Sequence, residues 1–262
     1  MNFSKKSLGQ NFLIEKNIIK KILNLIDLKN KHILEIGPGK GALTDEIILK
    51  KPKTLTLIEK DNNLINSLRL KYSGIKRIKF INKDILKFNY KSLAKKKIIV
   101  IGNLPYNISS QILVKILKEE KVEERFSDLI LMFQKELGEK IIAKFPSEHY
   151  GRLSILTKFN LDVINKFLIS ANCFKPKPKV TSMIIHFRTK INNNFNIKKI
   201  TSLEKITNIL FSNRRKMINK NLTKILDHKR IKQISNLKLH LRAEKLSPEI
   251  IYKITELYEK GR

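Results

Sequence analysis

Asn103, Pro105 and Tyr106 stand together after a short apolar run, in the stretch IIVIGNLPY at residues 98–106. The side-chain oxygen of Asn103 and the backbone carbonyl of Pro105 can each accept a hydrogen bond, and proline makes this backbone rigid. Tyr106 adds an aromatic ring. These groups could hold the exocyclic amine of a purine and stack on its ring, although the same residues also suit an ordinary turn.

A glycine-rich loop follows an earlier apolar run, HILEI, and contains Gly37, Gly39 and Gly41 in the sequence GPGKGA. Glycines let the backbone turn sharply and let a ligand approach it closely. The next apolar run, TLTLIE, ends in Glu59, at a spacing where an acid can accept hydrogen bonds from ribose hydroxyls. The pattern predicts a nucleotide-type cofactor. It also satisfies the dinucleotide fingerprint, so an NAD-dependent enzyme stays open at this point.

Asp84 distinguishes between these cofactors, because it follows the third apolar run, IKFI, where it can accept a hydrogen bond from an adenine amine. Three consecutive strand ends thus carry Gly37 and Gly39, Glu59, and Asp84. This set suits the methionyl, ribose and adenine parts of S-adenosylmethionine, which has no pyrophosphate to bind. S-adenosylmethionine is therefore the predicted cofactor, although either acid alone would also fit an ordinary loop.

A methyl donor beside Asn103, Pro105 and Tyr106 indicates a specific reaction. An adenine amine is a poor nucleophile because its lone pair is delocalised into the ring. Two preorganised oxygens on its N–H groups would stabilise the positive charge that builds on nitrogen during methyl transfer. No strong general base is needed, since the methylated cationic amine loses its proton readily.

The elements that must position these residues alternate along the chain from Lys31 to about Arg188. Apolar, β-branched runs are predicted strands at HILEI, TLTLIE, IKFI, IIVIG and LILMF. Helical patterns begin at Ala42, at Asn62 and after Ser109, and another runs through Leu137 and Ile141. Such alternation predicts an α/β fold, a doubly wound sheet with mostly parallel strands. The last two runs, VINKFLI and VTSMIIHF, predict an antiparallel edge.

After residues 191–197, INNNFNI, the pattern becomes helical, and this segment is the predicted linker. The expected domains are residues 1–190, with a basic N-terminal segment and first helix in 1–30, and a helical domain over 198–262. One helical face is expected to gather the apolar residues Ile218, Leu222, Ile225 and Leu226, with Lys216, Lys220 and Lys224 roughly opposite.

The chain carries 55 Lys and Arg against 23 Asp and Glu, a net charge of +32, which predicts a polyanionic partner such as a nucleic acid. Drift in an AT-rich genome would explain the lysines but not the shortage of acids. No apolar run approaches the roughly 20 residues that span a bilayer, and the N-terminus lacks a secretory signal pattern. A cytoplasmic protein without membrane contact is expected. One cysteine excludes an internal disulfide, and the five histidines show no metal-ligand spacing, so no metal is expected.

The motifs named so far, with several others, resemble the KsgA family of ribosomal RNA adenine dimethyltransferases. The resemblance covers about 190 residues, through SLGQNFL (7–13), EIGPG, IE (58–59), KD (83–84), GNLPYNIS, QKE (134–136), YGRLS (150–154) and FKPKPKV (174–180). It implies a seven-stranded, Rossmann-like class I S-adenosylmethionine methyltransferase with a small all-helical C-terminal domain.

The resemblance also implies roles for individual residues. Asn11 and Leu13 would join Gly37, Gly39, Glu59, Asp84 and Asn103 in the cofactor site. Asn103, Pro105 and Tyr106 match the catalytic loop, and Phe174 matches an aromatic residue that stacks on the other face of the target adenine. Without the family match, Phe174 is read as a core residue before a proline-stiffened turn.

The implied reaction dimethylates two adjacent adenosines in the hairpin loop near the 3′ end of 16S rRNA, in the 30S subunit, with a role in subunit biogenesis. Three alternatives remain: an Erm-type enzyme acting on 23S rRNA, a non-catalytic ribosome-assembly factor that binds RNA, and an NAD oxidoreductase, for which no catalytic group stands out. A monomer is the expected state.

Overall fold

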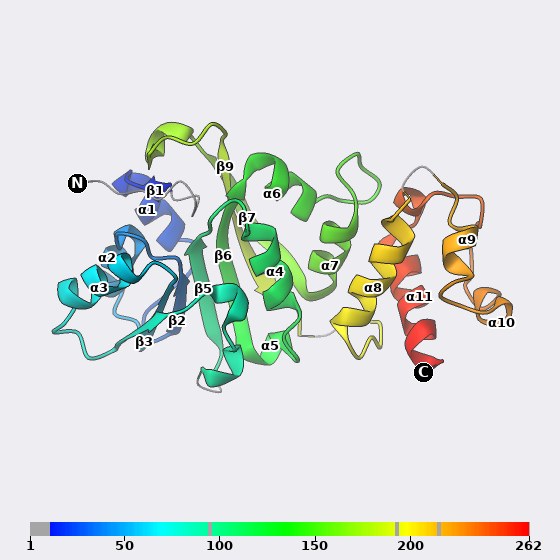
Figure 1. Ribbon diagram of the computed structural model, residues 1–262, viewed down its shortest axis with the longest axis horizontal. Helices are drawn as coiled ribbons and strands as arrows, with labels where there is room; N and C mark the ends of the chain where they lie inside the picture. Colours follow the sequence, from blue (N-terminus) through cyan, green and yellow to red (C-terminus); the bar gives the residue numbers. More distant parts are fainter. Residues whose placement is uncertain (1–10, 94–95, 192–193, 214–215, 262) are drawn as a thin grey trace. The chain divides into compact units, whose positions relative to one another are not determined.

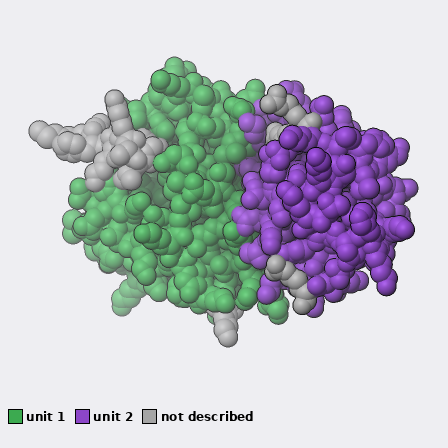
Figure 2. Space-filling view, turned by 45° about the vertical axis from the view of Figure 1, so that its right-hand side comes forward, with its two compact units in different colours: residues 1–138, 162–189 green, residues 139–161, 190–262 purple. Residues whose placement is uncertain are grey.

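The computed structural model describes residues 11–93, 96–191, 194–213 and 216–261. The chain divides into two compact units, coloured separately in Figure 2. Unit 1 comprises residues 1–138 and 162–189, and unit 2 comprises residues 139–161 and 190–262. Each unit has its own core, and the site described below lies within unit 1.

Unit 1 is built on a seven-stranded sheet, labelled in Figure 1. In spatial order its strands are β4 (Ile78–Asn82), β3 (Thr54–Glu59), β2 (His32–Ile36), β5 (Ile98–Asn103), β6 (Phe126–Gln134), β9 (Ser182–Thr189) and β7 (Leu161–Ile169). β4, β3, β2, β5 and β6 pair in parallel, whereas β9 pairs antiparallel to β6. The predicted α/β class is confirmed, and every predicted strand is present. Parallel pairing brings the carboxyl ends of β2, β3, β4 and β5 to one edge.

Helices connect these strands as the pattern predicts. Those of unit 1 are α1 (Lys16–Leu23), α2 (Ala42–Leu49), α3 (Asn62–Lys71), η2 (Ile85–Lys87), η3 (Tyr90–Ser92), α4 (Ser109–Leu117), α5 (Val122–Arg125), α6 (Lys135–Ile141), which continues into unit 2, and η4 (Ala171–Cys173). The core on one sheet face joins buried residues of α1, α2 and α3 to Ile33, Leu57 and Ile101. Side chains of a strand alternate between faces, so β3, β5 and β6 each place two alternate residues in this core.

A second, two-stranded sheet was not expected from the sequence. β1 (Phe12–Leu13) pairs antiparallel with β8 (Phe174–Lys175), so that Leu13 lies opposite Phe174. Strands of two residues show no period, and this pairing depends on a contact between segments about 160 residues apart. The pairing brings the end of the N-terminal segment into unit 1.

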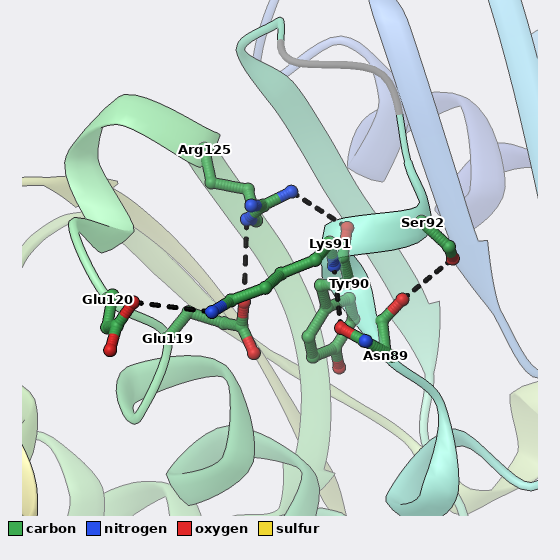
Figure 3. A network of polar contacts seen from close by, with 7 residues as sticks. All are labelled: Asn89, Tyr90, Lys91, Ser92, Glu119, Glu120 and Arg125. Carbon is green, nitrogen blue, oxygen red and sulfur yellow. Dashed lines mark hydrogen bonds and ion pairs between the residues drawn. The ribbon is translucent and has the colours of Figure 1, made fainter.

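A polar network joins η3 to the segment between α4 and β6 (Figure 3). The Arg125 guanidinium donates through Nη1 to the Tyr90 carbonyl at 2.7 Å, and its Nε lies 3.4 Å from the Glu119 carboxylate. Lys91 and Glu120 form an exposed ion pair at 3.4 Å beside them. This network lies at the edge of the sheet opposite the carboxyl ends of the strands.

Unit 2 is helical among its described residues. Besides the end of α6 it contains α7 (Arg152–Asn160), α8 (Ile200–Phe211), α9 (Asn219–Leu222), α10 (His228–Ile231), η5 (Ala243–Lys245) and α11 (Pro248–Lys260). Two buried tyrosines link α7 and the segment just before it to the C-terminal helices. The Tyr252 hydroxyl donates to the Ile155 carbonyl, and the Tyr150 hydroxyl donates to the Leu246 carbonyl, both at 2.9 Å.

These contacts explain why residues 139–161 group with the C-terminal helices, whereas the sequence analysis placed them in the first domain. The expected division at 190–198 stays a prediction, and residues 192–193 of the predicted linker lie outside the described residues. Residues 1–10 of the expected basic segment also lie outside them, whereas α1 matches the expected first helix.

The helix expected around Ile218–Leu226 is wrong in length, although its apolar residues are largely buried. α9 spans four residues, Asn219–Leu222, and the chain turns before α10. Asp227 begins α10 by accepting the Arg230 N–H at 2.8 Å, which stops the preceding turn from continuing. Ile218, Leu222 and Leu226 are buried, so the apolar pattern reports burial correctly without one continuous helix. Among the described residues, no helix has the length and apolar character needed to cross a membrane.

Candidate active site

A cavity of about 640 Å³ opens at the carboxyl ends of β2, β3 and β5. Ligands bind at this edge in open α/β sheets, and this volume is typical of sites for molecules of cofactor size. The cavity brings together nearly all the residues singled out in the sequence. They are Asn11, Leu13, Gly37, Gly39, Glu59, Asp84, Asn103, Pro105 and Tyr106.

The glycine loop forms one wall, and Gly39 shows why glycine is required there. Its φ is +57°, in the left-handed region that side-chain-bearing residues rarely adopt. A Cβ at Gly39 would also lie 2.9 Å from the ring of Phe12 in β1. The loop therefore lies tightly against the N-terminal strand.

Glu59 ends β3 and supports the same loop. Its Oε2 accepts the Gly39 N–H at 3.2 Å, and its Oε1 accepts the Asp61 N–H at 2.9 Å. Burial raises the pKa of the Glu59 carboxyl, and these backbone hydrogen bonds partly oppose that shift. Each carboxylate oxygen has a further lone pair, so Glu59 can hold the loop and still accept from a ligand hydroxyl.

Asp84 lies at the next strand end and begins η2. Its Oδ1 accepts the Leu86 N–H, and its Oδ2 accepts from Lys60 Nζ, both at 2.9 Å. The hydrogen bond from Lys60 holds the pKa of Asp84 below its usual range. Asp84 is therefore ionised at neutral pH and acts only as an acceptor.

Asn103 ends β5 and contacts the N-terminal segment. Its amide nitrogen Nδ2 donates to the Asn11 carbonyl at 2.8 Å. This bond assigns the two ends of the amide, leaving Oδ1 as the end that can accept from a substrate amine. Asn11 is thus linked to the loop that follows β5, while residues 7–10 of the same motif lie outside the described residues.

Pro105 and Tyr106 follow as a turn that leads into α4. The Pro105 carbonyl accepts the Ile108 N–H at 3.2 Å, so one of its two lone pairs serves the turn and one remains for a ligand. The Ser109 hydroxyl donates to the Tyr106 carbonyl at 3.1 Å. At the other end of this residue, the Tyr106 phenol oxygen lies 2.6 Å from the Ser182 hydroxyl.

Phe174 lies elsewhere. Its side chain is 3% exposed and belongs to the core of unit 1, opposite Leu13 in the β1–β8 pair, and it is absent from the cavity lining. This placement agrees with the core interpretation that the residue types alone favour. Leu13 is also buried but does line the cavity.

Glu35 is a cavity residue that the sequence analysis missed. It is the penultimate residue of β2, is 1% exposed, and accepts from the Thr44 hydroxyl at 2.7 Å. Its second oxygen has no hydrogen-bond partner among the residues that the structure describes. Burial raises the pKa of Glu35 to about 8. An acid inside an otherwise apolar strand was the signal that could have identified it.

The donor and acceptor set fits S-adenosylmethionine. Acceptors at Glu59 and Asp84 suit a ribose diol and an adenine amine. Unlike a dinucleotide, S-adenosylmethionine has no pyrophosphate, so its site does not need cationic groups to bind one. When bound, this cofactor supplies an electrophilic methyl group on a sulfonium sulfur.

The seven-stranded sheet and its strand-end cavity define a Rossmann-like α/β fold, the fold of class I methyltransferases. Among solved structures, the chain resembles a dimethyladenosine transferase from Plasmodium falciparum (TM-score 0.75, 24% identity, 95% of this chain and 98% of that one). It also resembles the 23S rRNA methyltransferase ErmE (TM-score 0.70, 23% identity, 95% and 100%). At these identities the likeness shows the fold alone, which confirms the predicted class.

The particular family is shown by sequence. The family model described as ribosomal RNA adenine dimethylase matches residues 1–260. A protein of Pelagibacter ubique (strain HTCC1062), named ribosomal RNA small subunit methyltransferase A, is 43% identical over 260 residues, covering 99% of this chain and 98% of its own. A protein of the same name from Malacoplasma penetrans (strain HF-2) is 40% identical, covering 89% and 83%. The chain belongs to the ribosomal RNA adenine dimethylase family, which confirms the resemblance found in the sequence.

Proposed function

We propose that this protein uses S-adenosylmethionine to dimethylate adenosine amines in the RNA of the small ribosomal subunit. Family membership and the names of its relatives support this substrate. The observation that carries the proposal is the position of Asn103, whose amide oxygen is presented at a cofactor-sized cavity beside Tyr106.

The reaction forms a bond between the amine nitrogen and the methyl carbon and breaks the bond between that carbon and the sulfonium sulfur. Asn103 Oδ1 and the Pro105 carbonyl accept the two N–H groups of the amine. As positive charge develops on the nitrogen, these oxygens stabilise the transition state more than the ground state. The proton leaves to water after transfer, and a second round gives the dimethylated amine.

Tyr106 lies on the same loop and lines the cavity, which supports its role in stacking on the target base. Stacking of this kind is worth about 1–3 kcal/mol per base. That is comparable with the few kcal/mol needed to pull a base from its neighbours. The core position of Phe174 gives its predicted stacking role no such support.

In the cofactor site, we assign Asp84 to the adenine amine and Glu59 to the ribose hydroxyls. Gly37 and Gly39 leave room beside the methionyl part, and Asn11 and Leu13 close the cavity from the N-terminal side. Lys60 would keep the Asp84 carboxylate ionised while it accepts from adenine.

The finer proposal is that the targets are two adjacent adenosines in the 3′-terminal hairpin loop of 16S rRNA, within the 30S subunit. Unpaired loop bases are the usual targets of sequence-specific RNA readers. The net charge of +32 would bind the RNA backbone, with affinity falling as salt rises. The Erm-type alternative has less support, because its likeness to this chain is at the level of fold.

Methyl-labelled S-adenosylmethionine, offered with undermethylated 30S particles, large-subunit RNA and DNA, tests this proposal. After digestion to nucleosides, we expect labelled dimethyladenosine from the 30S sample alone. Label in large-subunit RNA would favour the Erm-type function, and cofactor binding without any transfer would favour a non-catalytic assembly factor.

A further inference from the structure

We propose that Ser182 is a positioning residue for methyl transfer, because its hydroxyl fixes the ring of Tyr106 in the orientation that stacks on the target base. The two side-chain oxygens lie 2.6 Å apart, although the residues are 76 positions apart in sequence. Tyr106 lines the cavity and Ser182 does not, so Ser182 acts through Tyr106. This inference rests on the proposed function of Tyr106.

Ser182 can hold the ring because its own position is tightly fixed. It is the first residue of β9, is 0% exposed, and pairs with Gln134 at the end of β6. The neighbouring Thr181 carbonyl accepts the Lys135 N–H at 2.9 Å. Met183, the next residue after Ser182, packs closely on Gly138. A Cβ added at Gly138 would lie 2.8 Å from the sulfur of Met183.

The main chain of Tyr106 is held independently of this bond. Ser109, at the start of α4, donates its hydroxyl to the Tyr106 carbonyl at 3.1 Å. Removing the Ser182 hydroxyl therefore leaves the loop anchored and affects mainly the direction of the ring. Burial raises the pKa of the Tyr106 phenol, so the hydroxyl stays protonated at neutral pH and keeps this hydrogen bond.

The arrangement also links two parts of the proposed site. β5 delivers Asn103 and Tyr106, whereas the segment from β8 to β9 ends at Ser182. The phenol of Tyr106 is thus fastened to a strand two places along the sheet from the strand that carries Asn103. The rate of a transfer reaction is sensitive to small displacements of a positioning group.

The test is a double-mutant cycle of Ser182→Ala and Tyr106→Phe, which each remove one hydroxyl and keep the Tyr106 ring position occupied by an aromatic. Single-turnover transfer from labelled S-adenosylmethionine to undermethylated 30S particles is measured together with cofactor affinity by calorimetry. We expect each single variant to transfer about tenfold more slowly, with cofactor affinity unchanged. We expect the double variant to be no slower than either single variant, since both changes remove the same bond.

Thr189→Val is the matched control. Thr189 lies at the other end of β9, where its buried hydroxyl donates to the Phe126 carbonyl at 2.7 Å. This variant also loses a buried hydroxyl of β9, and we expect it to transfer at the wild-type rate.

Wild-type transfer rates in Ser182→Ala, or rate losses that multiply in the double variant, would overturn the inference. If Ser182→Ala does not fold, Tyr106→Phe decides alone, because a wild-type rate in that variant overturns the inference as well. If the wild-type protein transfers no methyl group, the proposed function fails and this inference fails with it. If the wild type transfers methyl groups and the variants do so at the same rate, only this inference fails.

Discussion

The Asn103 side chain donates from Nδ2 to the backbone carbonyl of Asn11 at 2.8 Å, which joins the end of β5 to the N-terminal segment. An amide has a donor end and an acceptor end, and the acceptor is needed at the substrate amine. Because the Asn11 carbonyl binds the nitrogen end of the Asn103 amide, the oxygen end is left to face the substrate amine, as the proposed chemistry requires. It also explains how residues about 90 positions apart form one site.

Gly39→Ala is expected to impair cofactor binding. Alanine in the left-handed region costs roughly 1–2 kcal/mol, and its Cβ would meet the Phe12 ring at 2.9 Å. Relief of this strain and contact would move the loop away from the cofactor, so we expect S-adenosylmethionine affinity, measured by calorimetry, to fall about tenfold, which corresponds to about 1.4 kcal/mol.

Gly74→Ala is the matched control, because nothing lies within 4 Å of a Cβ at that position. It is expected to bind the cofactor like the wild type. Wild-type affinity in Gly39→Ala would contradict the requirement for glycine at this position of the cofactor site.

Glu35 makes stability depend on pH. Burial raises its pKa in the folded protein to about 8, from an ordinary value of 4.5. Between these values the native state binds more protons than the unfolded state, so the free energy of unfolding falls as pH rises. One such group contributes a slope of at most about 1.4 kcal/mol per pH unit.

Glu35→Gln removes this titration. Urea unfolding from pH 5 to pH 8 is expected to show the wild type losing stability relative to the variant as pH rises. Curves that stay parallel over this range would mean that Glu35 is ionised in the native protein throughout.

Arg125→Leu is expected to lower stability without affecting cofactor binding. Arg125 and Glu119 are largely buried in the network of Figure 3, and the variant leaves the carboxylate and the Tyr90 carbonyl without this donor. The loss of unfolding free energy is expected to be about 1–3 kcal/mol. Because the network lies at the amino ends of the strands, cofactor affinity should stay unchanged.

Lys91→Ala removes the exposed ion pair of the same network. The side chains of Lys91 and Glu120 in this pair are 63% and 85% exposed. Exposed pairs contribute about 0–1 kcal/mol, so urea unfolding should separate the two variants. Equal losses would contradict the distinction between the buried and exposed pairs.

Much of this site was predictable because its residues lie at strand ends that local patterns mark. The glycine loop, Glu59, Asp84 and Asn103 each follow a recognisable strand, and parallel pairing brings strand ends to one edge. Asn11 and Leu13 were reached only through resemblance, since a two-residue strand such as β1 has no pattern of its own.

Other features depend on long-range contacts that periodicity does not report. Glu35 is hidden inside an apolar strand, and Ser182 gains significance only when the fold places it against Tyr106. The grouping of α7 with the C-terminal helices depends on hydrogen bonds such as that from Tyr252 to Ile155. The stacking role implied for Phe174 stays a prediction, and its side chain lies in the same buried core cluster as Leu13 and Ile169.

The most direct test of the central claim compares the wild type with Asn103→Ala in single-turnover transfer to undermethylated 30S particles, with nucleosides analysed by mass spectrometry. Losing one preorganised hydrogen-bonding group at a reacting centre costs about 100- to 1,000-fold in rate. We predict dimethyladenosine from the wild type and at least about 100-fold slower formation by the variant, with a much smaller change in cofactor affinity. Wild-type rates in Asn103→Ala, or methylation of a group other than an adenosine amine, would contradict the account.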